Sequence, residues 1–138
     1  NAALLGDLLA VILAPYDDVG AFAGRIRVAV PRMGVGEKAA TSLALVVHEL
    51  ATNSLKYGAL SNDAGLLDIS GTATGQEVEL IWNEQGGQQV GSPKATEGYG
   101  NKLLHRTVTG QLGGSIDYDW TDTGVVVTLR LSEQHLAN

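Results

Sequence analysis

Three polar residues follow one another along a stretch of chain that is otherwise apolar. Glu49, Asn53 and Lys56 are spaced so that on a helix they fall on one strip, together with Ser42. A carboxylate can accept a proton, an amide oxygen is a hard ligand for Mg²⁺, and an ammonium group faces phosphate oxygens. The spacing indicates a site for a phosphate and its metal ion. A solvated stripe on a surface helix has the same pattern, and at this point both interpretations stay open.

A second candidate group ends an alternating stretch. Glu84 shares a strand face with Leu80 and Trp82, so its carboxylate emerges where the apolar face meets the next loop. Such a carboxylate can accept a hydrogen bond from an exocyclic amine such as that of adenine. Gly86 and Gly87 follow, and they let a ring or a phosphate approach the backbone closely. An ordinary acidic strand end before a glycine turn is the alternative.

The third candidate is the sequence Gly98-Tyr99-Gly100, ahead of a predicted helix. Free backbone N–H groups at a helix N-terminus, reached through glycines, form an anion site. Lys102 and Arg106 lie one turn apart inside that helix, within reach of a phosphate. A plain helix-entry turn with solvated basic side chains explains the same residues.

The helix that carries the polar strip is predicted over residues 37–57, which contain neither proline nor glycine, and Gly58 ends it. Shorter helices are predicted over residues 3–14, ended by Pro15, and over 101–112. The buried side of the long helix, with the polar strip opposite, is expected to comprise Leu43, Ala44, Val47, Leu50, Ala51, Ser54 and Leu55.

Alternating apolar and polar residues predict strands around residues 25–30, 67–69, 78–82, 116–120 and 125–131. One apolar and one polar face per strand is typical of antiparallel sheets that are solvated on one side. Three helices must then cover the apolar face. The sequence predicts an α/β (α+β) fold: a two-layer sandwich with a mixed, mostly antiparallel sheet of about five strands and three helices on one face.

Composition limits the partners. The formal net charge is −6 with nine Lys and Arg, which argues against binding nucleic acid. The lack of cysteine excludes disulfides and thiolate zinc sites. The first apolar run, residues 2–14, is too short to cross a bilayer and lacks the basic start of a signal peptide. We expect a cytoplasmic domain without membrane contact.

Taken in this order, the three motifs resemble the ATP-binding fold shared by histidine kinases, gyrase, Hsp90 and MutL; they are Glu49-x-x-x-Asn53, Glu84-x-Gly86-Gly87 and Gly98-x-Gly100. The stretch HELATNSLKYGALS, residues 48–61, more closely resembles the HWE-type sensor histidine kinases. That group is named for a histidine in this helix and a Trp-x-Glu on the later strand. Those residues are His48, Trp82 and Glu84 here, and the resemblance covers nearly the whole chain.

The resemblance implies a role for each matching residue. Asn53 would coordinate Mg²⁺, and Glu49 would be the acid that assists attack on the γ-phosphate of ATP. Glu84 would hold the adenine amino group, and Trp82 would anchor the core rather than contact ATP. His48 belongs to the motif, but on a helical wheel it lies away from the strip of Glu49 and Asn53, so either a structural role or a role in supporting a ligand-binding residue stays open. The other implied nucleotide contacts are Lys56 and Tyr57 near the phosphates and ribose, Gly86 and Gly87 at the adenine pocket, Gly98, Tyr99 and Gly100 around the phosphates, and Thr128 behind the adenine.

The resemblance also implies partners. The kinase would transfer the γ-phosphoryl of Mg-ATP to a histidine on its own dimerisation and phosphoacceptor domain, for onward transfer to an aspartate of a response regulator. We expect residues 1–16 to be the tail of that dimerisation element and residues 17–138 the catalytic ATP-binding domain, a monomer that binds ATP but does not autophosphorylate by itself. Two alternatives stay open: a degenerate docking scaffold without ATP, which the intact motifs disfavour, and a serine kinase of the anti-sigma type, which the Trp-x-Glu disfavours.

Overall fold

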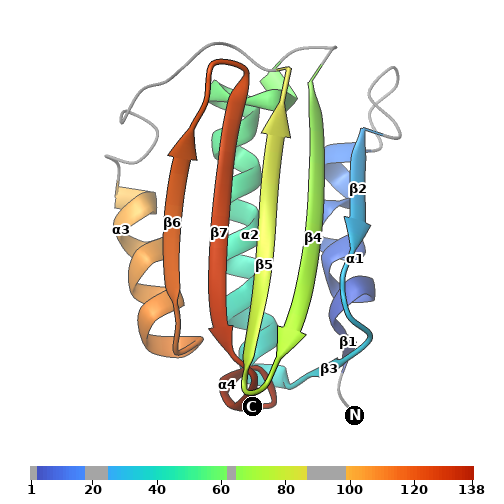
Figure 1. The fold of residues 1–138 in the computed structure, drawn as a ribbon, viewed down its shortest axis with the longest axis vertical. Helices are drawn as coiled ribbons and strands as arrows, with labels where there is room; N and C mark the ends of the chain where they lie inside the picture. Colours follow the sequence, from blue (N-terminus) through green and yellow to red (C-terminus); the bar gives the residue numbers. More distant parts are fainter. Residues whose placement is uncertain (1–2, 18–24, 62–64, 87–98) are drawn as a thin grey trace.

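The computed structural model describes residues 3–17, 25–61, 65–86 and 99–138, and its main feature is a five-stranded sheet (Figure 1). The strand order is β2-β4-β5-β7-β6, with β2 and β4 parallel and the other neighbours antiparallel. The strands are β2 (Ile26–Ala29), β4 (Leu66–Thr74), β5 (Glu77–Gln85), β6 (Ser115–Trp120) and β7 (Gly124–Ser132). The predicted mixed, mostly antiparallel sheet is confirmed.

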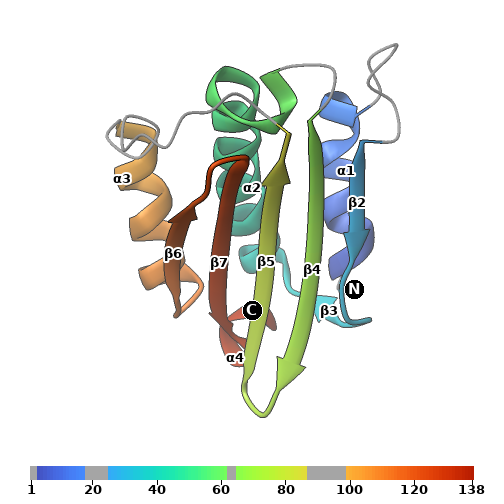
Figure 2. The ribbon, with the colours of Figure 1, turned by 45° about the horizontal axis from the view of Figure 1, so that its top comes forward.

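Helices cover one face of this sheet and leave the other open (Figures 1 and 2). They are α1 (Leu5–Asp17), α2 (Glu37–Tyr57) and α3 (Tyr99–Arg106), of which α2 lies behind the middle strands. Short elements complete the layer: β1 (Ala3–Leu4) paired with β3 (Gly34–Val35), the 3₁₀ turn η2 (Ala59–Ser61), the π-helical turn η4 (Thr107–Gln111) and α4 (Glu133–Leu136). The described part of the chain has no helix long and apolar enough to cross a membrane.

The core lies between the two layers because every strand presents alternate apolar residues to the helices. On β5 the inward residues are Val78, Leu80, Trp82 and Glu84, and all four are buried. On β7 the inward set runs from Val125 to Leu131, also by alternation. The outward residues carry the ion pairs of the open face, in which Arg130 contacts Asp117 and Glu79.

Helix α2 begins and ends where the sequence predicts. Gly58 follows it and donates its backbone N–H to the Ser54 carbonyl at 2.9 Å. Two details of its predicted faces are wrong. Leu55 is 44% exposed, because at 100° per residue it lies about 140° from the centre of the buried stripe at Leu50. Asn53 lies beside that stripe rather than opposite it, and therefore faces the sheet side.

The other two helices differ from prediction at their ends. Helix α1 continues past Pro15 to Asp17, because Val11 is 72% exposed and water can solvate the carbonyl that Pro15 leaves without a helical donor. Its predicted first residues form β1 instead. The helix predicted over 101–112 starts earlier, at Tyr99, and widens into η4, where the Leu112 N–H reaches back to the Thr107 carbonyl at 3.1 Å.

Helix α1 shares the core with the rest of the chain. Leu5, Leu9 and Leu13 are at most 1% exposed and belong to the same apolar cluster as α2 and the sheet. The packing therefore shows no break near residue 16, and the assignment of residues 1–16 to a dimerisation element stays a prediction.

The C-terminal residues close against the start of α2. The backbone N–H groups of Gly36 and Lys38 donate to the carbonyls of Leu136 (2.8 Å) and Asn138 (2.9 Å). These donors are two of those that a helix N-terminus leaves without intrahelical partners. The last turn of the chain thus caps the helix that carries the polar strip.

Candidate functional site

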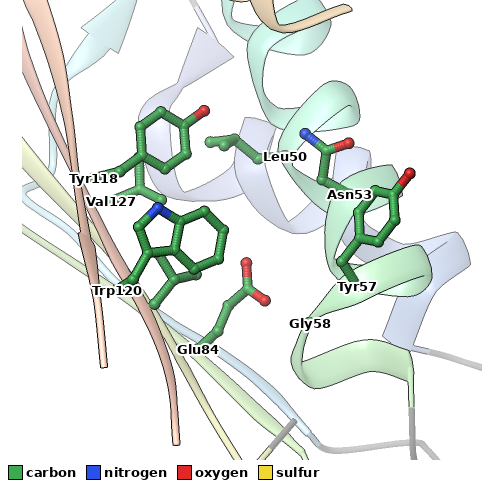
Figure 3. Close-up of a pocket in the computed structure, with 9 residues that line it drawn as sticks. Leu50, Asn53, Tyr57, Gly58, Glu84, Tyr118, Trp120 and Val127 are labelled. Carbon is green, nitrogen blue, oxygen red and sulfur yellow. The ribbon is translucent and has the colours of Figure 1, made fainter. Parts of the chain in front are cut away.

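A pocket opens between the last turns of α2 and the inward faces of β5, β6 and β7 (Figure 3). Its walls are mainly apolar or aromatic, and the amide of Asn53 from α2 and the carboxylate of Glu84 from β5 reach it. The remaining lining residues are Leu50, Tyr57, Gly58, Tyr118, Trp120, Val125 and Val127. An apolar hollow with a few convergent polar groups is the usual form of a small-molecule site.

Glu84 is the most constrained polar group of this pocket. Its residue is 4% exposed, and its carboxylate accepts three hydrogen bonds from within the chain. Oε1 accepts from the Ser54 hydroxyl at 2.9 Å and from the Ala59 backbone N–H at 3.0 Å, while Oε2 accepts from the Trp82 indole N–H at 2.6 Å. Donors from α2, η2 and β5 therefore replace the water that a buried carboxylate loses.

Gly58 lets this arrangement form. A Cβ atom at Gly58 would lie 2.0 Å from Oε1 of Glu84, far inside contact distance. Figure 3 shows the carboxylate next to the Gly58 end of α2. The glycine thus serves the approach of α2 to the carboxylate as well as the end of the helix.

Two stacked aromatic rings form the β6 side of the pocket. The ring centroids of Tyr118 and Trp120 are 6.0 Å apart with an interplanar angle of 8°. Burial, together with the charges of Glu49 and Glu84, raises the pKa of Tyr118 to about 12. The phenol is therefore neutral at physiological pH.

The predicted strip on α2 divides in the structure. Asn53 lines the pocket, and Glu49, half-buried one turn earlier, is close enough to influence Tyr118. Lys56 is exposed on the last turn, and Tyr57 lines the pocket while remaining 37% exposed. Of the three strip residues Glu49, Asn53 and Lys56, Asn53 is therefore the one that lines the pocket.

The structure describes two of the four glycines that were predicted to contact the nucleotide. Gly86 directly follows β5 with a φ of 77°, a left-handed conformation that favours glycine, and its N–H donates to the Thr123 carbonyl at 2.9 Å. Helix α3 begins with Tyr99 and Gly100. Gly87 and Gly98 lie outside the described residues, so their implied roles stay predictions.

The structure corrects the predicted position of Thr128 behind the adenine. On β7 the buried residues are Val125, Val127 and Leu129, so Thr128 points to the open face of the sheet, away from the pocket. The β7 residues that reach the pocket are Val125 and Val127.

Several residues that line the pocket or bond to its lining have no counterpart among the predicted contacts. Ser54 was expected to be buried, but its bond to Glu84 depends on a partner 30 residues away. Tyr118 and Trp120 are paired with Val127 and Val125, which the alternation of both strands would have revealed once the β6–β7 hairpin was assumed.

The histidine of the motif lies apart from the pocket. His48 is exposed, and its Nδ1 is 2.5 Å from the hydroxyl of Tyr16 at the end of α1, with the rings edge to face. The contact joins α1 to α2, and His48 does not line the pocket.

Comparison with known proteins finds histidine kinases. The chain is 37% identical over 133 residues to blue-light-activated histidine kinase 1 of Erythrobacter litoralis, an alignment that covers 95% of this chain and 36% of the relative. It is 33% identical over 129 residues to a blue-light-activated histidine kinase of Brucella ovis, covering 91% of this chain and 26% of that protein. The chain is a histidine kinase homologue. It spans about a third or less of the length of these relatives, and no protein-family model matches it.

Solved structures show the same fold for this histidine kinase homologue. The histidine kinase domain of a blue-light-activated kinase from Erythrobacter litoralis superposes with a TM-score of 0.76 at 18% identity, covering 96% of this chain and 64% of that one. The nucleotide-free catalytic domain of the histidine kinase ThkA superposes with a TM-score of 0.70 at 15% identity, covering 96% of both chains. The fold is that of histidine kinase catalytic domains.

Proposed function

We propose that this chain is the ATP-binding catalytic domain of a sensor histidine kinase of the HWE type. The observation that carries the proposal is the buried Glu84 carboxylate in an apolar pocket, next to an asparagine on α2. The homology to histidine kinases gives the reaction class, transfer of the γ-phosphoryl of ATP to a histidine.

At the base end, the proposal assigns adenine to the apolar pocket. Leu50, Val125 and Val127 offer aliphatic contacts, and Trp120 offers an aromatic edge or face to a purine. The Glu84 carboxylate would accept a hydrogen bond from the exocyclic amine of adenine. A carboxylate disfavours a base that presents a carbonyl oxygen at the same position.

At the phosphate end, the proposal assigns Mg²⁺ to Asn53. Among the described residues no three His, Asp or Glu form a metal-binding group, so the ion would rest on the Asn53 amide oxygen, nucleotide oxygens and water, a ligand set that suits Mg²⁺. When bound, Mg²⁺ neutralises charge that develops on the phosphates. Glu49 would accept the proton of the attacking histidine, and Lys56, Tyr57 and the residues 98–100 would contact ribose and phosphates.

The proposed reaction also needs partners outside this domain. The acceptor histidine would lie on the dimerisation and phosphoacceptor domain, and a response regulator aspartate would receive the phosphoryl group. A cytoplasmic location follows from that partnership, because response regulators act in the cytoplasm. The homologues support the reaction class; these partners are part of the proposal.

Calorimetric titration of ATP, with and without Mg²⁺, tests the proposal on the wild type and on Asn53→Ala. We expect Mg²⁺-dependent binding in the wild type, and an affinity at least about tenfold weaker in the variant when Mg²⁺ is present, because the protein ligand of the ion is gone. Asn83→Ala is the matched control, since Asn83 is a half-buried asparagine on the outward side of β5. Wild-type protein that does not bind ATP at millimolar concentration would favour the degenerate scaffold.

A further inference from the structure

The Trp82 indole N–H donates to a buried carboxylate. Trp82 is 2% exposed, and a buried indole N–H needs a hydrogen-bond partner. Here the partner is a carboxylate two residues along the same strand, at 2.6 Å, and that carboxylate also lines the pocket. The buried Trp82 is therefore hydrogen-bonded directly to Glu84, the carboxylate that lines the pocket.

The two oxygens of Glu84 are used differently. Oε1 accepts two hydrogen bonds, from Ser54 and from the backbone of Ala59, whereas Oε2 accepts one, from Trp82. A carboxylate offers about four acceptor positions, two on each oxygen. Within the part of the chain that the structure describes, these bonds fill both positions of Oε1 and leave Oε2 able to accept one more.

The bonds also fix the orientation of the carboxylate. Ser54 is 1% exposed and its hydroxyl oxygen accepts the Leu60 N–H at 3.1 Å, which directs its own proton to Glu84. Donors on the α2 side hold Oε1, so rotation of the carboxylate would have to break bonds to Ser54 and Ala59. A donor on the β5 side holds Oε2, and together they define one position for the free acceptor site.

We infer that Trp82 is a positioning residue, whose indole N–H fixes Oε2 of Glu84 as the acceptor for the amino group of the bound base. This inference rests on the proposed ATP binding and adds to it. Trp82 does not line the pocket, so its effect on the ligand passes through Glu84. A tryptophan two residues before the glutamate supplies this donor because i and i+2 share a strand face.

The test compares two nucleotides on the wild type and on Trp82→Phe. The nucleotides are ATP and purine riboside 5′-triphosphate, which lacks the 6-amino group. Phenylalanine keeps an aromatic ring in the core and removes the N–H. We expect the wild type to prefer ATP, and Trp82→Phe to lose about tenfold in ATP affinity while its affinity for the analogue changes less than about twofold.

Leu80→Ala is the matched control, because Leu80 is 2% exposed on the same face of β5 and does not line the pocket. It removes apolar packing and leaves the Trp82–Glu84 bond, so its preference for ATP over the analogue should equal that of the wild type. An unchanged preference in Trp82→Phe would overturn the inference and leave the proposed function standing. A wild type that binds both nucleotides equally would overturn it too, and a wild type that binds neither would refute the proposed function.

A measurement on the wild type decides the matter if Trp82→Phe does not fold. The chain has two tryptophans, so its amide correlation spectrum contains two indole N–H signals, which Trp120→Phe assigns. We expect the Trp82 indole proton to resonate downfield of the Trp120 proton, to exchange with solvent slowly, and to move upfield in Glu84→Gln. A Trp82 signal at the position of a free indole, unmoved by Glu84→Gln, would overturn the inference.

Discussion

Strand β5 carries Glu79 and Glu84 on opposite faces of the sheet, and the two glutamates differ in almost every physical respect. Glu79 points to the open face, where its side chain is 35% exposed and lies 3.4 Å from Arg130. Glu84 points to the helical layer, is 4% exposed, and accepts hydrogen bonds from a hydroxyl, a backbone amide and an indole. The same residue type is an exposed ion-pair partner on one face and a fixed acceptor on the other.

The difference shows that the site depends on the layer of helices that covers one face of the sheet. An exposed ion pair contributes about 1 kcal/mol or less, because water screens it. A buried carboxylate needs its donors, and removing either side leaves unpaired groups that cost about 1–3 kcal/mol each. Substitutions on the helical face should therefore affect both ligand binding and stability, whereas those on the open face should affect neither by much.

The largest effect is expected from Glu84→Gln, compared with Glu79→Gln. The amide group of glutamine cannot accept at both ends, so it places a donor against one of the existing donors and weakens the contact to the base. ATP affinity should fall about 10- to 100-fold and stability by about 1–3 kcal/mol. Glu79→Gln should change ATP affinity by less than about twofold and the free energy of unfolding by less than about 1 kcal/mol. Titration calorimetry and urea unfolding measure both, and equal effects of the two variants would contradict the comparison.

A smaller effect is expected from Gly58→Ala. The added methyl would meet Oε1 of Glu84 at 2.0 Å, so the carboxylate or the end of α2 must shift. Stability should fall by about 1–3 kcal/mol, and ATP affinity should fall with it. The control is Gly110→Ala, because a Cβ there meets nothing within 4 Å. A Gly58→Ala protein with wild-type ATP affinity would show that the carboxylate position is not critical.

Tyr118→Phe should change how stability depends on alkaline pH. The pKa of Tyr118 is raised to about 12 in the folded protein, above about 10 for an exposed tyrosine, so the folded state favours the neutral phenol. That contribution is complete below about pH 10 and is lost as the pH rises toward 12. Between these values the wild type should lose about 1–2 kcal/mol more than Tyr118→Phe, allowing for partial solvent exposure. Urea unfolding at pH 9 and pH 11 measures the difference, and parallel losses in the two proteins would refute it.

The smallest effect is expected from Thr128→Val. Thr128 lies on the open face of β7, so ATP affinity should stay within about twofold of the wild type. Calorimetry at saturating Mg²⁺ measures this. A loss of tenfold or more would mean that the threonine contacts the nucleotide after all, and would contradict the assignment of the pocket to the helical face.

Much of the fold could be predicted because it depends on patterns of neighbouring residues in the sequence. The bounds of α2 follow from a run without glycine or proline between glycines, and the inward position of Glu84 follows from alternation with Val78, Leu80 and Trp82. Alternation also contradicts the predicted contact of Thr128 with adenine. Val127 and Leu129 on either side of it are apolar and face the helices, so Thr128 faces the other way. That prediction came from the resemblance to a family and not from the strand itself.

The rest of the site depends on contacts between distant residues. The donors to Oε1 of Glu84 lie 30 and 25 residues before it, and no local pattern indicates which hydroxyl or amide will meet the carboxylate. The position of Asn53 beside the buried stripe depends on how α2 rotates against the sheet. That rotation is set by packing of the whole layer, so the spacing of Glu49, Asn53 and Lys56 predicted the strip but not its side.

Helix α2 is held at both of its ends by backbone bonds or side chains from elsewhere in the chain. Carbonyls of Leu136 and Asn138 accept from its first turn, and Glu84 binds Ser54 in its last. Helix ends ordinarily fray, and their amide protons exchange with solvent much faster than those in the middle. In this protein the terminal turns of α2 should resist fraying, and the helix should open for hydrogen exchange as a single unit from Glu37 to Tyr57.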